Sequence, residues 1–360
     1  MPSVSLADGR DTRKVETHPH VPVHSIVYAV GDIHGRLDLL TGVTDEIRRE
    51  VAAATSGLDR VTVIFLGDYI DRGPDSRGVI AHLIAWRAEG LCDTVFLRGN
   101  HEQILLDLID DGDAADPMMW LQYGGVETLG AYGVDQAYAV GPKEAALVSE
   151  RARAALPPAH LDFIRSTRLT AERGDYLFVH AGVRPDRLLN EQTDADLLWY
   201  RFFDDRRPVH GKVVVHGHTP RERPVVGRWR IGLDTEAYAS GALTAMRLEG
   251  ADRRFLKIQV APDTAAVSAR GWESIDPPHH GPATRSAGRP DGPRPSSSKR
   301  RRSGGRPDRV LLFSRAAVGA ALLGTILAAA WFYVGHAGAP GADVSRSKIS
   351  STRAVNTGRP

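Results

Sequence analysis

The chain contains a single cysteine and lacks an apolar run near its start. Cys92 alone cannot form an internal disulfide, which excludes a disulfide-stabilised fold and suits a reducing compartment. Residues 1–24 are polar and have no hydrophobic centre of the kind that a secretory signal peptide needs. The sequence therefore predicts no secretory signal.

Acidic and basic residues are unevenly distributed along the chain, whose formal net charge is +2. From Asp263 onward there are fifteen Lys or Arg and six Asp or Glu, a net charge of +9 that leaves about −7 for residues 1–262. The first part has no stripe of basic and aromatic residues, so nucleic acid is not an expected partner. With 42% hydrophobic and 25% charged residues, the chain can bury one core of ordinary size.

Two segments of different composition follow the predicted core. Residues 263–308 are rich in Pro, Ser, Gly and Arg without hydrophobic periodicity, which predicts a disordered basic linker. Residues 316–334 carry no charge and end in Trp331-Phe332-Tyr333; as a helix they would be about 28 Å long, close to the hydrocarbon thickness of a bilayer. We expect a membrane span here, with a core helix or a loosely structured tail as the alternative.

The charges beside this span predict its orientation. Seven Lys or Arg lie in residues 299–315, whereas three lie in the twenty residues after Val334. Because positively charged segments beside a membrane span stay on the cytoplasmic side, we expect a single-pass protein of the cell membrane whose folded domain faces the cytoplasm. The basic linker would bind anionic lipid headgroups. The predicted organisation is a flexible N-terminus (1–23), a folded domain (24–262), the linker (263–308), the span (309–335) and an extracytoplasmic tail (336–360).

Five short motifs rich in Asp, Asn or His each follow a strand-like apolar run. The motifs are Gly31-Asp32-Ile33-His34-Gly35, Gly67-Asp68-Tyr69-Ile70-Asp71-Arg72-Gly73, Gly99-Asn100-His101-Glu102, His180-Ala181-Gly182 and His216-Gly217-His218-Thr219. In open α/β sheets, the loops at the carboxyl ends of strands gather around a ligand site. We therefore expect the five motifs to converge.

Helical and strand-like patterns divide the folded domain into two parts. Helical spacing follows the first two motifs, at residues 40–51 and 79–86, whereas strand-like runs dominate after Gly174. These later runs are residues 175–180, 212–216, 229–233, 242–248 and 254–260. The pattern predicts an α/β fold in which two sheets meet face to face with helices outside, while residues 103–172 form a mostly helical cap beside the site.

The side chains of the motifs predict a pair of metal ions. Alternate side chains of an extended chain point the same way, so Asp32 and His34 can approach one ion together. Asp68 has two carboxylate oxygens and can bridge two cations held about 3.5–4 Å apart. The second ion would be completed by Asn100, His180 and His218. Oxygen and imidazole ligands without thiolate favour manganese, iron or zinc, and the choice among the three stays open.

Three further polar residues receive structural assignments. His216 directly follows a strand-like run, so we assign it to a strand end and choose His218 as the ligand. Asp234 follows another such run, and a turn explains it equally well. No Cys-x5-Arg loop surrounds Cys92, which excludes thiol-based phosphate chemistry and leaves this residue a packing role.

The motifs together resemble those of the phosphoprotein phosphatase family within the calcineurin-like metallophosphoesterases, over most of residues 24–240. The Asp71-Arg72-Gly73 extension and Gly99-Asn100-His101-Glu102 are similar to this branch in particular. The resemblance implies an αββα sandwich of two mixed sheets with outer helices, in addition to the predicted C-terminal transmembrane helix.

The resemblance also implies roles for individual residues. Asp32, His34 and Asp68 would bind the first metal, and Asp68, Asn100, His180 and His218 the second. His101 would protonate the leaving oxygen as general acid, and Asp71 would orient its ring. Arg72 would offer a planar fork to phosphate oxygens, and Arg201, in Leu198-Trp199-Tyr200-Arg201, resembles the family's second phosphate-binding arginine.

The implied activity is hydrolysis of phosphate monoesters by a metal-bridging hydroxide, with phosphoserine or phosphothreonine in proteins as the first choice of substrate. Phosphotyrosine and small phosphate esters are further candidates. Two alternatives stay open: a symmetrical bis(5'-nucleosyl)-tetraphosphatase of the same family, and a membrane-held module that binds phosphorylated partners without cleaving them. The expected cofactors are two divalent ions, manganese first, with iron or zinc as alternatives.

Overall fold

The structure is a computed structural model, and it describes residues 18–53, 60–111, 115–134, 147–202, 204–260 and 267–274. Contacts divide the chain into the units Met1–Arg285 and Ser286–Pro360, and every described residue belongs to the first unit. Within those ranges, no helix has the length and apolar character needed to cross a membrane. The predicted span at residues 309–335 and the tail that follows it lie outside the described residues.

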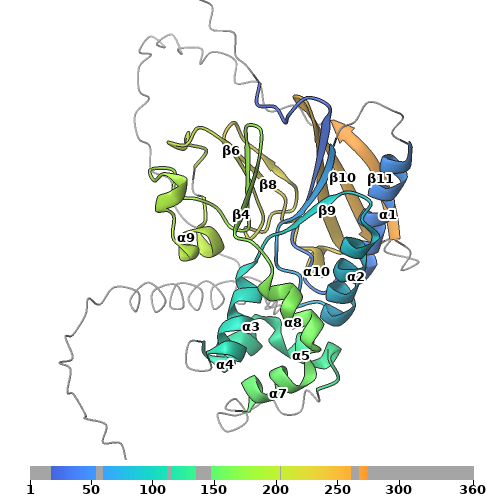
Figure 1. The fold of residues 1–360 in the computed structure, drawn as a ribbon, viewed down its shortest axis with the longest axis vertical. Coiled ribbons are helices and arrows are strands. Elements are labelled where there is room, and N and C mark those ends of the chain that lie inside the picture. The colour runs from blue at the N-terminus through green and yellow to red at the C-terminus, as the bar shows by residue number, and fades with distance from the viewer. Residues whose placement is uncertain are drawn as a thin grey trace, which may run out of the picture. The chain divides into compact units, whose positions relative to one another are not determined.

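A six-stranded mixed sheet forms one layer of the fold, with strand order β11-β10-β9-β1-β2-β3 (Figure 1). Its members are β1 (Ser25–Val30), β2 (Arg60–Phe65), β3 (Asp93–Phe96), β9 (Ala242–Glu249), β10 (Asp252–Val260) and β11 (Val267–Ser274). Strands β1, β2 and β3 run parallel, in register from Ser25 opposite Arg60, and β9, β10 and β11 add antiparallel neighbours. The first three motifs therefore leave the sheet at the same edge.

A second mixed sheet of five strands has the order β4-β5-β6-β8-β7. Its members are β4 (Thr170–Arg173), β5 (Tyr176–Val179), β6 (Val213–His216), β7 (Val225–Val226) and β8 (Arg230–Gly232). The central strands β5, β6 and β8 are parallel, and the edge strands β4 and β7 are antiparallel to their neighbours. His180 directly follows β5, and His216 is the last residue of β6.

Helices cover the outer faces of the two sheets and gather at one end of them (Figure 1). Helices α1 (Leu37–Ala53) and α2 (Ser76–Glu89) pack on the six-stranded sheet, and α9 (Asp194–Trp199) packs on the other. The end group comprises α3 (Asn100–Asp110), α4 (Pro117–Trp120), the π-helical turn η1 (Leu121–Gly125), α5 (Val126–Ala131), α7 (Val148–Ala155) and α8 (Pro158–Arg165). Two short elements, η3 (Leu189–Glu191) and α10 (Ala237–Ser240), complete the described set.

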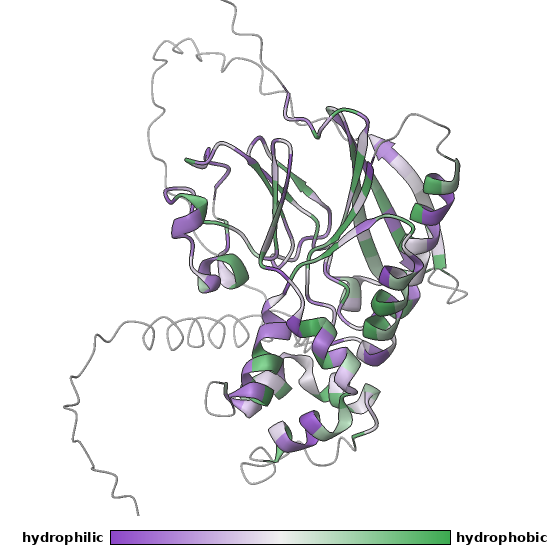
Figure 2. Ribbon diagram, viewed as in Figure 1, coloured by the Kyte–Doolittle hydropathy of each residue, from purple (hydrophilic) through white to green (hydrophobic). Residues whose placement is uncertain are grey.

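Alternating side chains of the central strands pack into two separate hydrophobic clusters. Tyr28 and Val30 of β1 face the helices α1 and α2, whereas Val27 and Ala29 pack between the sheets with residues such as Phe178. Both faces of β1 are buried, and Figure 2 shows its hydrophobic colouring continuing into neighbouring strands. The predicted α/β fold with two face-to-face sheets, both mixed, is confirmed, and so are the five late strands and the helical character of residues 103–172 where they are described.

The structure corrects one predicted boundary. The linker was expected to begin at residue 263, but Val267–Ser274 form β11, which pairs with β10 at the edge of the six-stranded sheet. Trp272 places its ring centroid 5.5 Å from that of Tyr28. An edge strand exposes one face and one row of backbone groups, so it lacks the apolar alternation by which the other strands were identified. The folded domain therefore extends at least to Ser274.

Candidate metal centre

The predicted ligands lie at the carboxyl-terminal ends of their strands and are all buried. Exposed fractions are 3% or less for Asp32, His34, Asp68, Asn100 and His180, and 8% for His218. Asp32 follows β1, Asp68 follows β2, and Asn100 opens α3, the helix after β3. Segments separated by almost two hundred residues are thus brought to one point, as the strand-end pattern predicted.

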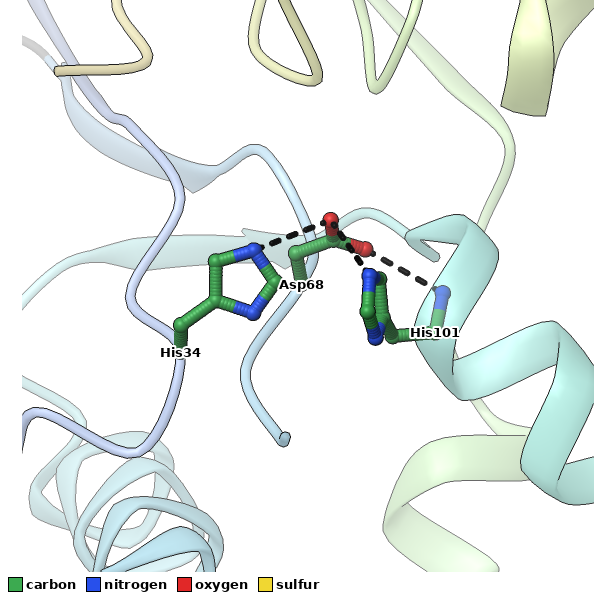
Figure 3. A group of neighbouring side chains, drawn as sticks. All are labelled: His34, Asp68 and His101. Carbon is green, nitrogen blue, oxygen red and sulfur yellow. Dashed lines mark hydrogen bonds and ion pairs between the residues drawn. The ribbon is translucent and has the colours of Figure 1, made fainter. Parts of the chain in front are cut away.

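Asp68 lies at the centre of this group, with histidines around its carboxylate. His34 Nε2 is 3.4 Å and His101 Nε2 3.9 Å from Asp68 Oδ2, and His180 Nε2 is 3.3 Å from Oδ1. Figure 3 shows His34 and His101 directed at this carboxylate from opposite sides. Burial alone would raise the pKa of Asp68, but attraction to His180, His101 and His34 whenever these rings are charged outweighs burial and lowers that pKa. The carboxylate is therefore ionised.

Two compact groups of potential metal ligands share Asp68. One contains His34, Asp68 and His101, and the other contains Asp68, His180 and His218; within each group the ligand atoms lie within 4.8 Å of one another. A carboxylate common to two such groups has the chemistry of a bridging ligand, because each of its oxygens can serve a different ion.

The histidines His34 and His180 have the same supporting contact. Nδ1 of His34 lies 2.9 Å from the carbonyl oxygen of Ile70, and Nδ1 of His180 lies 3.0 Å from that of Leu66. A carbonyl only accepts, so each Nδ1 carries the proton and each Nε2 keeps a lone pair directed at the centre. Burial lowers the pKa of both rings, which keeps them neutral. Neutral imidazole with an outward lone pair is the form that binds a metal.

Asn100 shows most clearly that a cation fits this site. Its Oδ1 lies 2.9 Å from His180 Nε2 and 2.9 Å from His218 Nδ1. Because the proton of His180 is on Nδ1, the lone pair of Nε2 faces the amide oxygen. Burial is the main cause that keeps the pKa of His218 well below its usual value. Lone pairs that converge in a buried space are stabilised by a positive ion.

Asp32 supplies a second sign of an ion. Its Oδ2 accepts the backbone N–H of His218 at 2.8 Å, whereas its buried Oδ1 has no hydrogen-bond partner among the described residues. Burial, Asp234 and Asp68 raise the pKa of Asp32 well above its usual value, as expected for acidic groups crowded together without a counter-charge. A side chain at Gly217 would collide with Oδ1, so glycine is required there. Asp32 belongs to neither compact ligand group, but its unpartnered buried oxygen fits a cation beside Asp68.

His101 has a different environment from the other histidines. Its Nδ1 lies 2.7 Å from Asp71 Oδ2, and Asp71 is completely buried. Burial disfavours the charged ring, but Asp68 and Asp71 together raise the pKa of His101 above its usual value. The ring can therefore hold a proton that His34 and His180 cannot.

The guanidinium of Arg72 lies beside the free nitrogen of His101. Arg72 Nη2 is 3.3 Å from His101 Nε2, and the guanidinium lies 4.9 Å from the ring centre of Tyr238. A cation bound to that nitrogen would be repelled by the neighbouring guanidinium. Arginine only donates, so His101 Nε2 accepts from Arg72 in this structure, and the guanidinium lowers the pKa of His101 while Asp68 and Asp71 raise it. The role of His101 as proton donor stays a prediction.

Residues from the helical cap hold Asp71 in place, and the sequence did not identify them. Trp120 Nε1 donates to Asp71 Oδ2 at 3.0 Å, and Thr128 Oγ1 donates to Oδ1 at 2.6 Å. The Asp71 backbone N–H donates to Thr128 Oγ1 at 2.9 Å and to Ser76 Oγ at 3.1 Å. Nothing in the sequence of the cap, which carries many charged residues, singled out Trp120 or Thr128.

Glu102 is a further residue whose function the sequence left unassigned. Its fully buried carboxylate accepts the backbone N–H groups of Asp68, Tyr69 and Gly99 at 2.8, 2.7 and 2.9 Å, and that of Ile70 at 3.2 Å. Burial first, and then the charge of Asp68, raise its pKa to about 7. Glu102 fixes the Asp68 loop to the start of α3, and its place in the third motif was the signal.

Left-handed backbone conformations cluster at the site. Among the residues that the structure describes, seven non-glycine residues have positive φ, and five of these are predicted site residues: His34, Asp68, Asp71, Arg72 and His218. Such conformations cost free energy and persist only where surrounding contacts impose them. The loops are therefore held in shapes that direct side chains inward.

Three remaining assignments have clear positions. Arg201 is exposed just beyond α9, where the ring of Trp199 lies 5.9 Å from that of His218. His216 ends β6 and packs 4.9 Å from the ring of Phe202; burial lowers its pKa to about 4, and it belongs to neither ligand group. Asp234 Oδ1 accepts the backbone N–H of Glu236 at 2.8 Å, as a turn residue does.

In a comparison with known protein families, the family described as calcineurin-like phosphoesterase matches residues 26–247. Serine/threonine-protein phosphatase 1 of Salmonella typhimurium (strain LT2) is 29% identical over 234 residues, which cover 62% of this chain and 92% of that protein. The asymmetrical bis(5'-nucleosyl)-tetraphosphatase PrpE of Bacillus velezensis is 27% identical over 235 residues, covering 61% of this chain and 87% of that protein. A cold-active protein-tyrosine phosphatase of a psychrophilic Shewanella covers 69% of this chain and 83% of its own, at 17% identity and a TM-score of 0.44.

Proposed function

The chain belongs to the calcineurin-like phosphoesterase family, and on that premise we propose that it is a serine/threonine protein phosphatase that uses two divalent metal ions. The observation that carries the proposal is Asp68, a buried carboxylate shared by two groups of ligands, beside a His101 that can hold a proton. The phosphatase of Salmonella typhimurium, matched over 92% of its length, supports the choice of substrate.

The residues that would hold the ions follow from the lone pairs they present. Asp32, His34 and Asp68 would hold one ion, and Asp68, Asn100, His180 and His218 the other. Once bound, such a pair activates water at neutral pH and neutralises charge on a phosphoryl group. Carboxylate, amide and imidazole ligands without thiolate support manganese as the native metal, with iron and zinc as the competitors.

The side chains outside the ligand set account for the rest of the reaction. His101 would give the proton on Nε2 to the leaving serine or threonine oxygen, and Asp71 would stabilise the charged ring beforehand. Arg72 is anchored by Tyr238 Oη at 3.2 Å and by the carbonyl of Tyr123 at 3.4 Å, which presents its guanidinium to phosphate oxygens. Arg201 would bind a further oxygen of the same phosphate.

A tetraphosphatase is the second candidate, because the protein of Bacillus velezensis aligns over nearly as much of the chain. The full-length protein should be assayed in manganese with a phosphoserine peptide and with diadenosine tetraphosphate. We expect kcat/KM to be higher for the peptide. A preference for diadenosine tetraphosphate would replace the phosphatase proposal with the tetraphosphatase.

We also propose that residues 309–335 anchor the enzyme in the cell membrane with the folded domain on its cytoplasmic side. The support is the uncharged stretch 316–334 and the seven basic residues before it. The full chain should sediment with membranes and resist extraction by alkaline carbonate, whereas a chain ending at residue 308 should not sediment. Equal sedimentation of the two proteins would contradict the anchor.

A further inference from the structure

A second arginine, Arg221, stands at the rim of the metal centre on the loop that carries His218. The Thr219 backbone N–H bonds the carbonyl of Gly217 at 2.7 Å, which makes a tight turn after the ligand. The Arg221 backbone N–H bonds the carbonyl of Asp234 at 3.1 Å. These two bonds fix the start of the Arg221 side chain beside the buried centre, while the residue itself is exposed.

Arg201 reaches the same rim from another direction. Helix α9 ends at Trp199, whose ring lies 5.9 Å from that of His218, and the Tyr200 backbone N–H closes the helix on the carbonyl of Asp196 at 3.1 Å. Arg201 follows directly. Arg221 is three residues from His218 in the sequence, and Arg201 is two residues from Trp199, whose ring lies beside that of His218.

Arg221 is among the groups that repel Arg201, and its Nη1 donates to the carbonyl of Pro220 at 2.9 Å. The pKa of Arg201 lies below its usual value because of partial burial and because Arg72 and Arg221 repel it, with Asp234 acting in the opposite direction. Neither Arg201 nor Arg221 forms an ion pair with a carboxylate in the part of the chain that the structure describes. Nearby, by contrast, Arg184 and Arg187 are paired with Asp196 at 2.6 and 3.1 Å.

Three arginines of like charge on one rim provide more positive charge than one phosphate monoester needs. Arg72 and Arg201 suffice for the phosphate that is cleaved, which leaves Arg221 for a different anionic group. Holding like charges together costs free energy, and an anion between them offsets that cost.

Building on the proposed function, we propose that Arg221 forms a second anion-binding subsite that selects substrates with another phosphate or carboxylate next to the one that is cleaved. For a protein substrate, this is a phosphoserine beside acidic residues. The second phosphate of a dinucleotide has the same chemistry, and the experiment below separates the two sources.

The test compares full-length wild-type protein with R221Q and with the control R223Q. Arg223 is exposed on the same loop and loses the same charge, but it is not among the residues that repel Arg201. Two phosphoserine peptides are used, identical except that glutamates flank the phosphoserine in one and glutamines in the other. The readout is the ratio of their kcat/KM values within each protein, which cancels differences in folded or metal-loaded fraction.

Wild-type protein and R223Q should prefer the glutamate peptide. In R221Q this preference should fall about fivefold, mainly through KM, because an exposed ion pair contributes at this level. The preference should also shrink as salt is raised. No preference in the wild type, or an equal loss in R223Q, would overturn the subsite. If wild-type protein cleaves neither peptide, the proposed phosphatase fails instead. The subsite is then tested by the ratio of kcat/KM for diadenosine tetraphosphate to kcat/KM for p-nitrophenyl phosphate, which R221Q should lower relative to the wild type.

Discussion

Two sides of the centre hold histidines against Asp68 in different ways. On the side of the strand-end loops, His34 and His180 place Nδ1 against the backbone carbonyls of Ile70 and Leu66, at 2.9 and 3.0 Å. On the side of the cap, His101 places Nδ1 against the carboxylate of Asp71 at 2.7 Å. A carbonyl fixes a neutral ring, whereas a carboxylate stabilises a charged one, so the partner of Nδ1 distinguishes a ligand from a proton donor.

The two sides also differ in where their supporting atoms come from. The carbonyls lie on the loops of the motifs themselves and require no particular side chain. The Asp71 carboxylate depends on Trp120 and Thr128, which lie about fifty residues further along the chain in the helical cap. The proton donor is therefore open to disruption from a distance, while the ligand side is locally determined.

Replacing the shared residue, Asp68→Asn, should have the largest effect, because both ligand groups lose the same charged member. We expect loss of both ions and a fall in kcat/KM greater than the roughly 100-fold that follows loss of a group supporting a metal ligand. Elemental analysis of purified protein and turnover of p-nitrophenyl phosphate in manganese measure the two effects. Far-UV circular dichroism controls for folding, and near-normal metal content in the variant would contradict the shared role.

Removing the proton donor, His101→Asn, should slow turnover by about 10²–10⁴-fold while metal content stays near that of the wild type. The loss should be smallest for p-nitrophenyl phosphate, because a good leaving group needs no proton. Assays with p-nitrophenyl phosphate and a phosphoserine peptide, together with elemental analysis, separate the two roles. If this variant lost its metals, His101 would be a ligand and the contrast between the two sides would fail.

The sequence predicted for a physical reason that the motif residues converge. Each motif follows a strand-like run, and parallel strands bring their carboxyl ends to one edge, so local pattern and general topology were enough to gather Asp32, Asp68 and His180. The family resemblance added His101 and Asp71. Their assigned roles stay predictions, since proximity alone does not establish chemistry.

Contacts between segments without a common pattern could not be predicted in the same way. Nothing in the spacing of Trp120 or Thr128 indicates Asp71 as their partner, because such contacts depend on how the cap packs. Strand β11 was missed for a related reason, since its exposed edge removes the alternation that identifies strands. The four backbone bonds to Glu102 likewise arise only once two loops meet.

Neutralising the partner of the proton donor, Asp71→Asn, should cost less than removing His101, about 10- to 100-fold in kcat. Asp71 raises the pKa of His101, so its neutralisation lowers that pKa. A general acid works only while protonated, and the alkaline fall of kcat should therefore move to lower pH in the variant. The measurement is kcat against pH for a phosphoserine peptide in both proteins. An unmoved alkaline limb would mean that Asp71 does not set the protonation of His101.

The smallest effect is expected from the cap, through Thr128→Val. This change keeps the shape of the side chain but removes the hydroxyl that donates to Asp71 Oδ1 at 2.6 Å and accepts from its backbone N–H at 2.9 Å. Losing bonds to a buried charged group should lower the free energy of unfolding by about 1–3 kcal/mol, measured by urea denaturation. It should also reduce kcat by up to about tenfold.

The matched control for the cap is Thr128→Ser, which restores the hydroxyl without the methyl group. If the hydroxyl positions Asp71, the serine variant recovers kcat and the alkaline limb of its pH profile, even if some packing energy stays lost. A serine variant as slow as the valine variant would assign the effect to packing of α5 against α2 instead. Trp120, whose Nε1 donates to Asp71 Oδ2, would then be the cap residue that positions Asp71 beside His101.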